Sequence, residues 1–490
     1  MITIDEMASF CKRKGLIYPS SEIYGGMSGF FDYGPYGSEM KKNLKDEWWK
    51  FHVRSREDIV GIDGSIITNP LVWKASGHVE GFEDLMLVAE DGSFEIRADQ
   101  FLEEKLGKNF DGVTAEQVNE LVQKHKLKAP NGKSFRKCES FNLMFTTNVG
   151  PKANEKSKAY LRPETAQIIF ADFKLIQENA RMKLPFGIAQ MGRAFRNEIS
   201  PRNFLFRCRE FEQLEIEYFV HPKQKKCPYM KEYEDFELNV FSADMQEKNL
   251  KPKKMKVKEA VKNNLMNEWH AYFLALETDW FVRLGCNPDN FRARQHLKDE
   301  LAHYSTDCWD LEYKFPFGWK ELEGIADRSD YDLKRHMEYS KKDLSLFDEA
   351  SKEKIVPHVI AEPSLGVDRA FLVFLYEAYH DDKKRGNIVL KLHPKIAPVN
   401  VAVLPLVSNK ENVLGNAREV FNELKKDYVC FFDTGGSIGR RYARQDEIGT
   451  PYCVTIDFET LEDGKVTIRD RDTTKQERVK IEDIGKHLRF

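Results

Sequence analysis

Cysteine is scarce and scattered in this sequence of 490 residues. The eight cysteines never form a Cys-x-x-Cys pair and stand at positions 11, 138, 208, 227, 286, 308, 430 and 453. Such spacing argues against both a zinc site and a disulfide framework. We therefore expect reduced thiols and no bound zinc.

Long apolar runs are also missing. No stretch approaches the roughly 20 apolar residues that span a bilayer, and the N-terminal segment MITIDEMASFCKRKG lacks the apolar core of a secretory signal. These absences predict a cytoplasmic protein with no membrane partner. The formal net charge is only −3, so a nucleic acid would have to bind through local basic patches rather than through an overall positive field.

The rest of the composition is that of ordinary globular proteins, with 41% hydrophobic and 32% charged residues. The length predicts roughly three domains. Residues 37–54 predict a helix capped by Ser38, with a wide apolar face that includes Trp48 and Trp49. Burial in the core and contact with a second subunit both explain that face. The apolar segment that follows predicts a strand ending at Pro70.

The stretch from 195 to 218, FRNEISPRNFLFRCREFEQLEIEY, has the most unusual pattern in the chain. A turn-prone segment leads into a predicted strand, whose alternate residues face opposite sides. One face grades from cations through an aromatic ring to carboxylates, which suits a ligand with an anionic end, a flat ring and a cationic group. An edge strand with a solvated ladder of charges is the alternative. The residues on this face are Arg207, Arg209, Phe211, Gln213, Glu215 and Glu217.

Other polar residues stand where elements are expected to begin or end. Glu164 stands at the start of a predicted helix, where interaction with the helix dipole is an alternative to ligand binding. Glu362 and Ser364 follow a buried strand predicted over 359–361. Arg369 opens the next helix, which is unfavourable for the helix dipole, so an anionic ligand would supply the compensation.

Two segments interrupt the apolar patterns and are interpreted as insertions. Residues 90–140 are charged and poorly patterned, and residues 221–305 are helical in pattern. The second has lysine clusters at 223–226 and 251–258, which are either solvated faces or sites for a polyanion. The final segment, 394–490, alternates strands with helices and predicts a small α/β domain with a mostly parallel sheet.

Several motifs together make the chain similar to the glycyl-tRNA synthetases of the homodimeric class II form. The match runs over most of the chain, and the blocks occur in the family's order. They are GFFDYGP (29–35), VWKASGH (72–78), FNLMF (141–145), LRPETAQ (161–167), FRNEISPR (195–202), REFEQLEIE (209–217), ELEGIADR (321–328), EPSLGVDR (362–369) and RQDEIGTPYCVTID (444–457).

The resemblance implies an α+β catalytic domain, with an antiparallel sheet flanked by helices, and a C-terminal α/β anticodon-binding domain. The catalytic domain would comprise 1–89, 141–220 and 306–393, and the anticodon-binding domain 394–490. ATP, magnesium, glycine and glycine tRNA would be the ligands of a homodimer. The implied reaction activates glycine with ATP to glycyl-adenylate and transfers glycine to the 3′ end of the tRNA.

The same resemblance implies an ATP site. Arg196 and Arg369 would be catalytic, with Arg196 on the α-phosphate and Arg207 on the distal phosphates. Phe211 would stack under adenine, with Arg369 over the other ring face. The remaining ATP contacts would be Asn197, Glu198, Glu321 and the Leu322 backbone, with Glu321 also binding magnesium.

The matching motifs also imply a glycine pocket formed by Glu164, Glu215, Glu362 and Ser364. Three carboxylates around one ammonium would make a cramped, wholly anionic niche. Such a niche excludes every amino acid that has a side chain, and steric exclusion needs no editing module.

Two departures from the family pattern stand out. Many relatives carry cysteine clusters near 90–100 and before FNLMF, whereas only Cys138 remains here. Relatives usually have glycine where this chain has Ile168. The main alternative function is a synthetase-like binding protein without catalysis, but such proteins lose the arginines and acids that this chain retains. A ligase for another small amino acid would need other contacts in the pocket.

Overall fold

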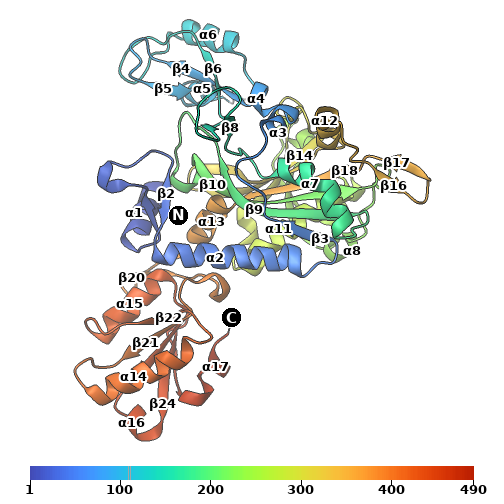
Figure 1. Ribbon diagram of the computed structural model, residues 1–490. Helices are drawn as coiled ribbons and strands as arrows, with labels where there is room; N and C mark the ends of the chain where they lie inside the picture. Colours follow the sequence, from blue (N-terminus) through green and yellow to red (C-terminus); the bar gives the residue numbers. More distant parts are fainter. Residues whose placement is uncertain (109, 111, 490) are drawn as a thin grey trace.

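A nine-stranded sheet organises the chain in the computed structural model, which describes residues 1–108, 110 and 112–489 (Figure 1). Residues 109 and 111 of the expected first insertion, and residue 490 of the expected C-terminal domain, lie outside the described residues. Within the described part of the chain, every helix is too short or too polar to cross a membrane.

The sheet is antiparallel in most of its pairings, as the family resemblance implied. Only β11 with β13 and β3 with β9 pair in parallel. The strands, in spatial order, are β12 (Lys253–Lys256), β11 (Glu237–Phe241), β13 (Phe291–Gln295), β14 (Asp307–Phe315), β15 (Gly318–Asp327), β18 (His358–Gly366), β10 (Glu210–Val220), β9 (Phe186–Phe195) and β3 (Ile59–Ile62).

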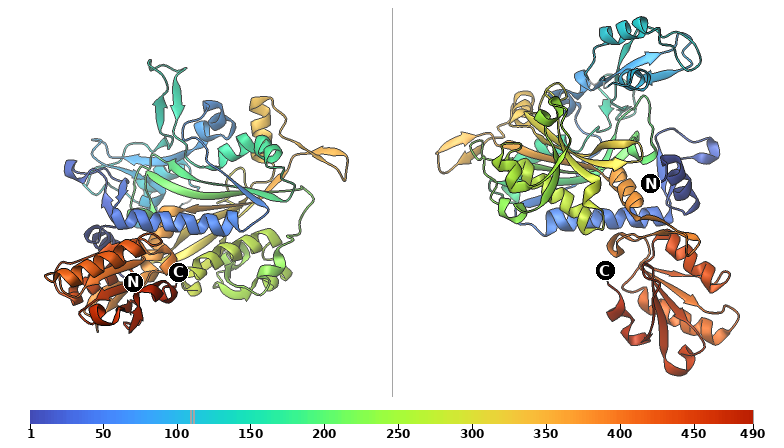
Figure 2. Two further views of the ribbon diagram at one scale, coloured as in Figure 1. Left: turned by 60° about the horizontal axis from the view of Figure 1, so that its bottom comes forward. Right: turned by 180° about the vertical axis from the view of Figure 1, so that it is seen from behind.

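Helices cover both faces of this sheet. On one face lie α2 (Pro35–Trp49), α11 (Glu268–Arg283) and α13 (Val367–Ala378), whose apolar side chains form the main core with the sheet. On the other face lie α7 (Ala166–Asn179) and α12 (Tyr331–Ser340), which form a second cluster. Figure 2 shows α2 running along the sheet on the same side as the C-terminal domain.

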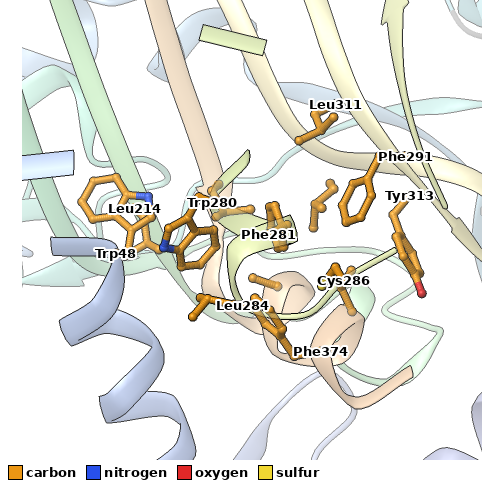
Figure 3. Close-up of a cluster of buried hydrophobic side chains, with 14 of the residues drawn as sticks. Trp48, Leu214, Trp280, Phe281, Leu284, Cys286, Phe291, Leu311, Tyr313 and Phe374 are labelled. Atoms are coloured by element: carbon orange, nitrogen blue, oxygen red, sulfur yellow. The ribbon is translucent and has the colours of Figure 1, made fainter. Parts of the chain in front are cut away.

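The apolar face of α2 is buried within the chain itself. Trp48 is only 1% exposed and packs beside Trp280 of α11, as Figure 3 shows. The subunit-contact interpretation of Trp48 is therefore wrong, because its ring is enclosed by this chain's own helices. Trp49 is partly buried and lies against Gly61, where an added Cβ would come within 2.0 Å of its ring.

The ends of several elements differ from those expected. Gly34 rather than Ser38 caps α2, because Pro35 occupies the first helical position, where its fixed φ is favourable. The strand after α2 ends at Ile62, and Pro70 begins α3 (Pro70–Ala75) instead. The Asn69 side chain caps that helix by accepting a hydrogen bond from Leu71 at 3.0 Å.

The segment 221–305 is not a purely helical insertion. It contributes β11, β12 and β13 to the main sheet, and α11 is buried along most of its length in the main core. Its three other α-helices are short: α8 (Met230–Tyr233), α9 (Ala243–Glu247) and α10 (Val257–Lys262).

A small module projects from the sheet on the side away from α2 (Figure 1). It has its own apolar core, and β4 pairs with both β5 and β6. The module begins at Glu83, seven residues before the expected start at 90, because β4 already belongs to it. Its elements are β4 (Glu83–Val88), β5 (Glu95–Arg97), α5 (Ala98–Leu106), α6 (Ala115–Lys124) and β6 (Glu139–Asn142).

The C-terminal domain has a separate core and a five-stranded mixed sheet. Only β21 forms parallel pairs, with β22 and β23, whereas β24 pairs antiparallel with β23 and β25. The expected mostly parallel sheet is therefore wrong for its second half, where the chain returns through a short helix and a hairpin. The elements are β21 (Val401–Pro405), α14 (Glu411–Leu424), β22 (Cys430–Phe432), α15 (Ile438–Ile448), β23 (Tyr452–Ile456), α16 (Thr460–Asp463), β24 (Lys465–Asp470) and β25 (Gln476–Lys480).

Candidate active site

A cavity of about 340 Å³ opens over β10, β15 and β18, on the face of the sheet away from α2. All the predicted site residues except Asn197 line it. The Asn197 backbone N–H instead donates to the Leu143 carbonyl at 2.8 Å. The predicted residues in the lining are Glu164, Arg196, Glu198, Arg207, Phe211, Glu215, Glu321, Leu322, Glu362, Ser364 and Arg369.

Strand register explains how distant segments meet here. Glu215 of β10 lies opposite Ser364 of β18, and Ser364 lies opposite Gly324 of β15 on the other side. Opposite residues in a sheet place their side chains on the same face. Phe211, Gln213 and Glu215 therefore share one face with Ser364, while Leu214 points into the core.

Arg196 lies just beyond the end of β9, with its guanidinium between two aromatic rings. The guanidinium carbon is 5.3 Å from the centre of the Phe211 ring and 5.5 Å from that of Phe82. Its Nε donates to the Pro163 carbonyl at 3.0 Å. No carboxylate among the described residues forms an ion pair with Arg196, so its charge is available to a ligand.

Arg369 reaches the same cavity from the first turn of α13. Its guanidinium lies over the Phe206 ring at 4.6 Å and donates to the Phe206 and Glu321 carbonyls at 3.2 and 3.0 Å. Arg207 completes this cationic half, with its Nε 3.8 Å from a carboxylate oxygen of Glu198. Burial lowers the pKa of Arg207, and Arg369 adds repulsion that an anionic ligand would relieve.

The carboxylates of the other half already have donors from the chain. Gln167 donates to Glu164 at 3.0 Å. Glu215 accepts hydrogen bonds from the hydroxyls of Thr165 and Ser364. Since each bond fixes a carboxylate, the niche is ordered without a ligand.

The niche departs from the expected wholly anionic one, because its carboxylates have a buried guanidinium and an imidazole as partners. Arg328, only 1% exposed, donates to Glu362 at 2.7 Å and forms two further hydrogen bonds with Asp332. The His78 Nε2 lies 3.3 Å from Glu164. A buried carboxylate is costly without such a partner, which is the physical reason for the departure.

These surroundings separate the protonation of the three glutamates. Burial would raise the pKa of Glu164, but His78 and then Arg328 hold it well below its usual range. Burial, followed by the charge of Glu164, raises the pKa of Glu215. Burial acts to raise the pKa of Glu362, whereas the guanidinium of Arg328, which donates directly to this carboxyl group, acts to lower that pKa and stabilises the ionised form.

Several lining or supporting residues were missed at the level of sequence. Arg328 and His78 each end a motif that had been recognised, ELEGIADR and VWKASGH, so the motifs contained the signal. His296 and Asp310 also line the cavity, with Nε2 and Oδ1 2.8 Å apart. Burial raises the pKa of Asp310 to about 6, although the hydrogen bond from His296 opposes that shift. No local pattern marked these two residues.

Comparisons with known proteins show which families the chain matches. Residues 145–378 match the family described as the tRNA synthetase class II core domain (G, H, P, S and T). Residues 400–489 match the family described as the anticodon binding domain.

Full-length relatives are similar to the whole chain. The glycine–tRNA ligase of Caldanaerobacter subterraneus subsp. tengcongensis is 44% identical, over 99% of this chain and 98% of the relative. That of Geobacillus kaustophilus is 41% identical over the same shares. Among solved structures, Giardia lamblia prolyl-tRNA synthetase in complex with prolyl-adenylate has a similar fold, with a TM-score of 0.59 and 15% identity over 98% of this chain and 76% of that chain.

Proposed function

The chain belongs to the glycine–tRNA ligases, and we propose that its central cavity carries out both steps of their reaction. In the first step a carboxylate oxygen of glycine attacks the α-phosphorus of ATP, and pyrophosphate leaves. In the second step the terminal adenosine hydroxyl of the tRNA attacks the glycyl carbonyl carbon, and AMP leaves. The convergence of Arg196, Arg369 and three buried glutamates on one cavity carries this proposal.

The cationic half of the cavity suits the triphosphate. Arg196 would contact the α-phosphate, where its planar fork can donate to two oxygens. Arg207 would bind the distal phosphates. Phosphoryl chemistry of this kind depends on positioning and on charge neutralisation, so no protein nucleophile is required. Glu198 and Phe211 would contact the adenine, with Arg369 above the ring.

The residues at the mouth of the cavity also fit magnesium. The Glu321 side chain is 51% exposed, and its Oε1 lies 3.3 Å from a nitrogen of Arg369. Magnesium takes oxygen ligands and is usually held by one or two carboxylates together with phosphate oxygens and water. Glu321 would hold the ion beside the triphosphate, and the bound ion would neutralise phosphate charge.

The carboxylate half suits a single small ammonium. Glu164, Glu215 and Glu362 would surround the glycine nitrogen, and Ser364 would complete the hydrogen bonds. The niche selects glycine by leaving no space for a side chain, which is more effective than rejecting a substrate that is one methylene too small.

The C-terminal domain would bind the anticodon of glycine tRNA. On α15, Arg441 is buried against the Leu406 carbonyl at 3.2 Å, and Arg444 pairs with Asp433. Arg440 is exposed, so its charge can meet a phosphate.

We expect this ligase to act as a homodimer in the cytoplasm. Apolar side chains are exposed at Ile66 and Ile67, between β3 and α3, and at Leu71 on α3, where a second subunit would cover them. Light scattering that gives the mass of one chain would contradict the dimer.

The activity itself is tested by exchange of labelled pyrophosphate into ATP. Glycine should drive the exchange, and alanine and threonine should not. Folded protein that shows no exchange with glycine would instead support a synthetase-like binding protein without catalysis.

A further inference from the structure

Glu217 is a buried acid that the proposed reaction does not use. It lies on β10 two residues beyond Glu215 and is 0% exposed. Neither of its carboxyl oxygens has a hydrogen-bond partner among the described residues. An ionised carboxylate buried without a donor is strongly destabilising, so this acid needs an explanation.

The charged groups around Glu217 come from four elements. One of its carboxyl oxygens lies within 4.8 Å of an oxygen of Glu215, on the same strand, and of an oxygen of Glu362 on β18. Arg328, just after β15, and Asp332 on α12 also act on it electrostatically. Two enclosed carboxylates at such a distance are not both ionised, because their repulsion is not screened by water.

The hydrogen bonds around this group show where the negative charge belongs. Arg328 donates directly to Glu362 at 2.7 Å, whereas Glu217 receives no such bond. A guanidinium is always charged and stabilises the ionised form of the carboxyl that it contacts. The shared proton therefore belongs on Glu217, and the negative charge belongs on Glu362.

We propose that Glu217 is a positioning residue for glycine, which holds a proton and donates it to the Glu362 carboxylate. Rotation of the two carboxyl groups can shorten a separation within 4.8 Å to a hydrogen bond. Glu362 is then held from one side by Arg328 and from another by Glu217, with its remaining lone pairs directed to the substrate ammonium. This inference rests on the proposed function, because Glu362 is assigned there to the glycine niche.

The inference is tested with two substitutions of similar volume. Glu217→Gln keeps a donor to Glu362 and should leave the KM for glycine within about threefold of wild type. Glu217→Met removes the donor and should raise the KM for glycine about tenfold or more, while the KM for ATP stays within about twofold. Glu210→Gln, at the more exposed end of the same strand, is the matched control and should behave as wild type.

The pH dependence of the KM for glycine distinguishes a proton donor from a purely structural residue. Burial, followed by the charge of Glu362, raises the pKa of Glu217 well above its usual range, so the protonated form is favoured and the proton is lost only as the pH rises through the raised value. The KM for glycine should then increase with pH more steeply in wild type than in Glu217→Gln. Dividing one pH profile by the other cancels the contribution of the ionisation of free glycine, which is the same for both proteins.

Three results would overturn the inference. The first is a KM for glycine that rises as much in Glu217→Gln as in Glu217→Met. The second is an equal rise of the KM values for glycine and for ATP in Glu217→Met. The third is a ratio of the pH profiles that does not change with pH. If Glu217→Met does not fold, Glu217→Gln and its pH ratio still decide the matter. Wild-type protein that shows no glycine-dependent exchange would count against the proposed function rather than against the role of Glu217.

Discussion

The charged side chains in the two halves of the cavity have different kinds of partners within the chain. In the cationic half, Arg196 and Arg369 rest on backbone carbonyls and aromatic rings, with weak or absent carboxylate partners. In the carboxylate half, Glu215 and Glu362 are bonded to hydroxyls and to a guanidinium of the chain. The triphosphate supplies negative charge when it binds, so the guanidinium groups that bind it need no carboxylate partners within the chain. Glycine is too small to order a site, so its niche is ordered in advance.

The largest expected effect comes from removing a cation that has no partner in the chain. Arg196→Ala should reduce the rate of adenylate formation at least about a hundredfold, because one donor aimed at developing phosphate charge is typically worth that much. Single-turnover formation of glycyl-adenylate measures it. Arg193→Ala is the control, since Arg193 is 62% exposed on β9 and pairs with Glu210. A near-normal rate in Arg196→Ala would remove Arg196 from the α-phosphate.

A smaller and more selective effect is expected in the carboxylate half. Glu362→Gln removes the charge that faces the ammonium and also removes one of the two carboxylates that pair with Arg328, the other being Asp332. The KM for glycine should rise about tenfold to a hundredfold, with the KM for ATP nearly unchanged. Glu353→Gln, on the exposed strand β17 (Glu353–Ile355), is the control. Equal losses for the two substrates would indicate a structural acid.

The smallest effect concerns stacking. Phe211→Leu keeps an apolar side chain but removes the flat face beneath the expected adenine. The KM for ATP should rise about tenfold, since aromatic stacking on a base is worth about 1–3 kcal/mol. Phe347→Leu, at a phenylalanine that is 59% exposed on β16 (Leu346–Asp348), should change nothing. An unchanged KM for ATP in Phe211→Leu would place the adenine elsewhere.

The sequence predicted the cavity better than it predicted the elements around it. Alternation along β10 places Phe211 and Glu215 on one face whatever the neighbouring strands are, so local pattern was sufficient there. The strands within 221–305 were missed because they are short and owe their stability to the sheet that they join. Local pattern contains no information about such partners.

The buried pairs of polar side chains show the same limit of sequence-based prediction. Arg328 and Glu362 are 34 residues apart, and His78 and Glu164 lie on separate segments that meet only in the folded chain. A carboxylate in a motif signals a binding site, but its internal partner depends on tertiary packing. For that reason the niche was expected to be wholly anionic, although buried charge requires compensation.

The most direct test measures equilibrium binding of ATP and of glycine, each alone, to Arg196→Ala and Glu362→Gln by isothermal titration calorimetry. If the two halves bind their ligands independently, Arg196→Ala weakens the binding of ATP about tenfold or more and leaves the binding of glycine unchanged. Glu362→Gln then weakens the binding of glycine and leaves the binding of ATP unchanged. Variants that each weaken both ligands by the same factor would show that the cavity is one cooperative unit and would contradict the division described here.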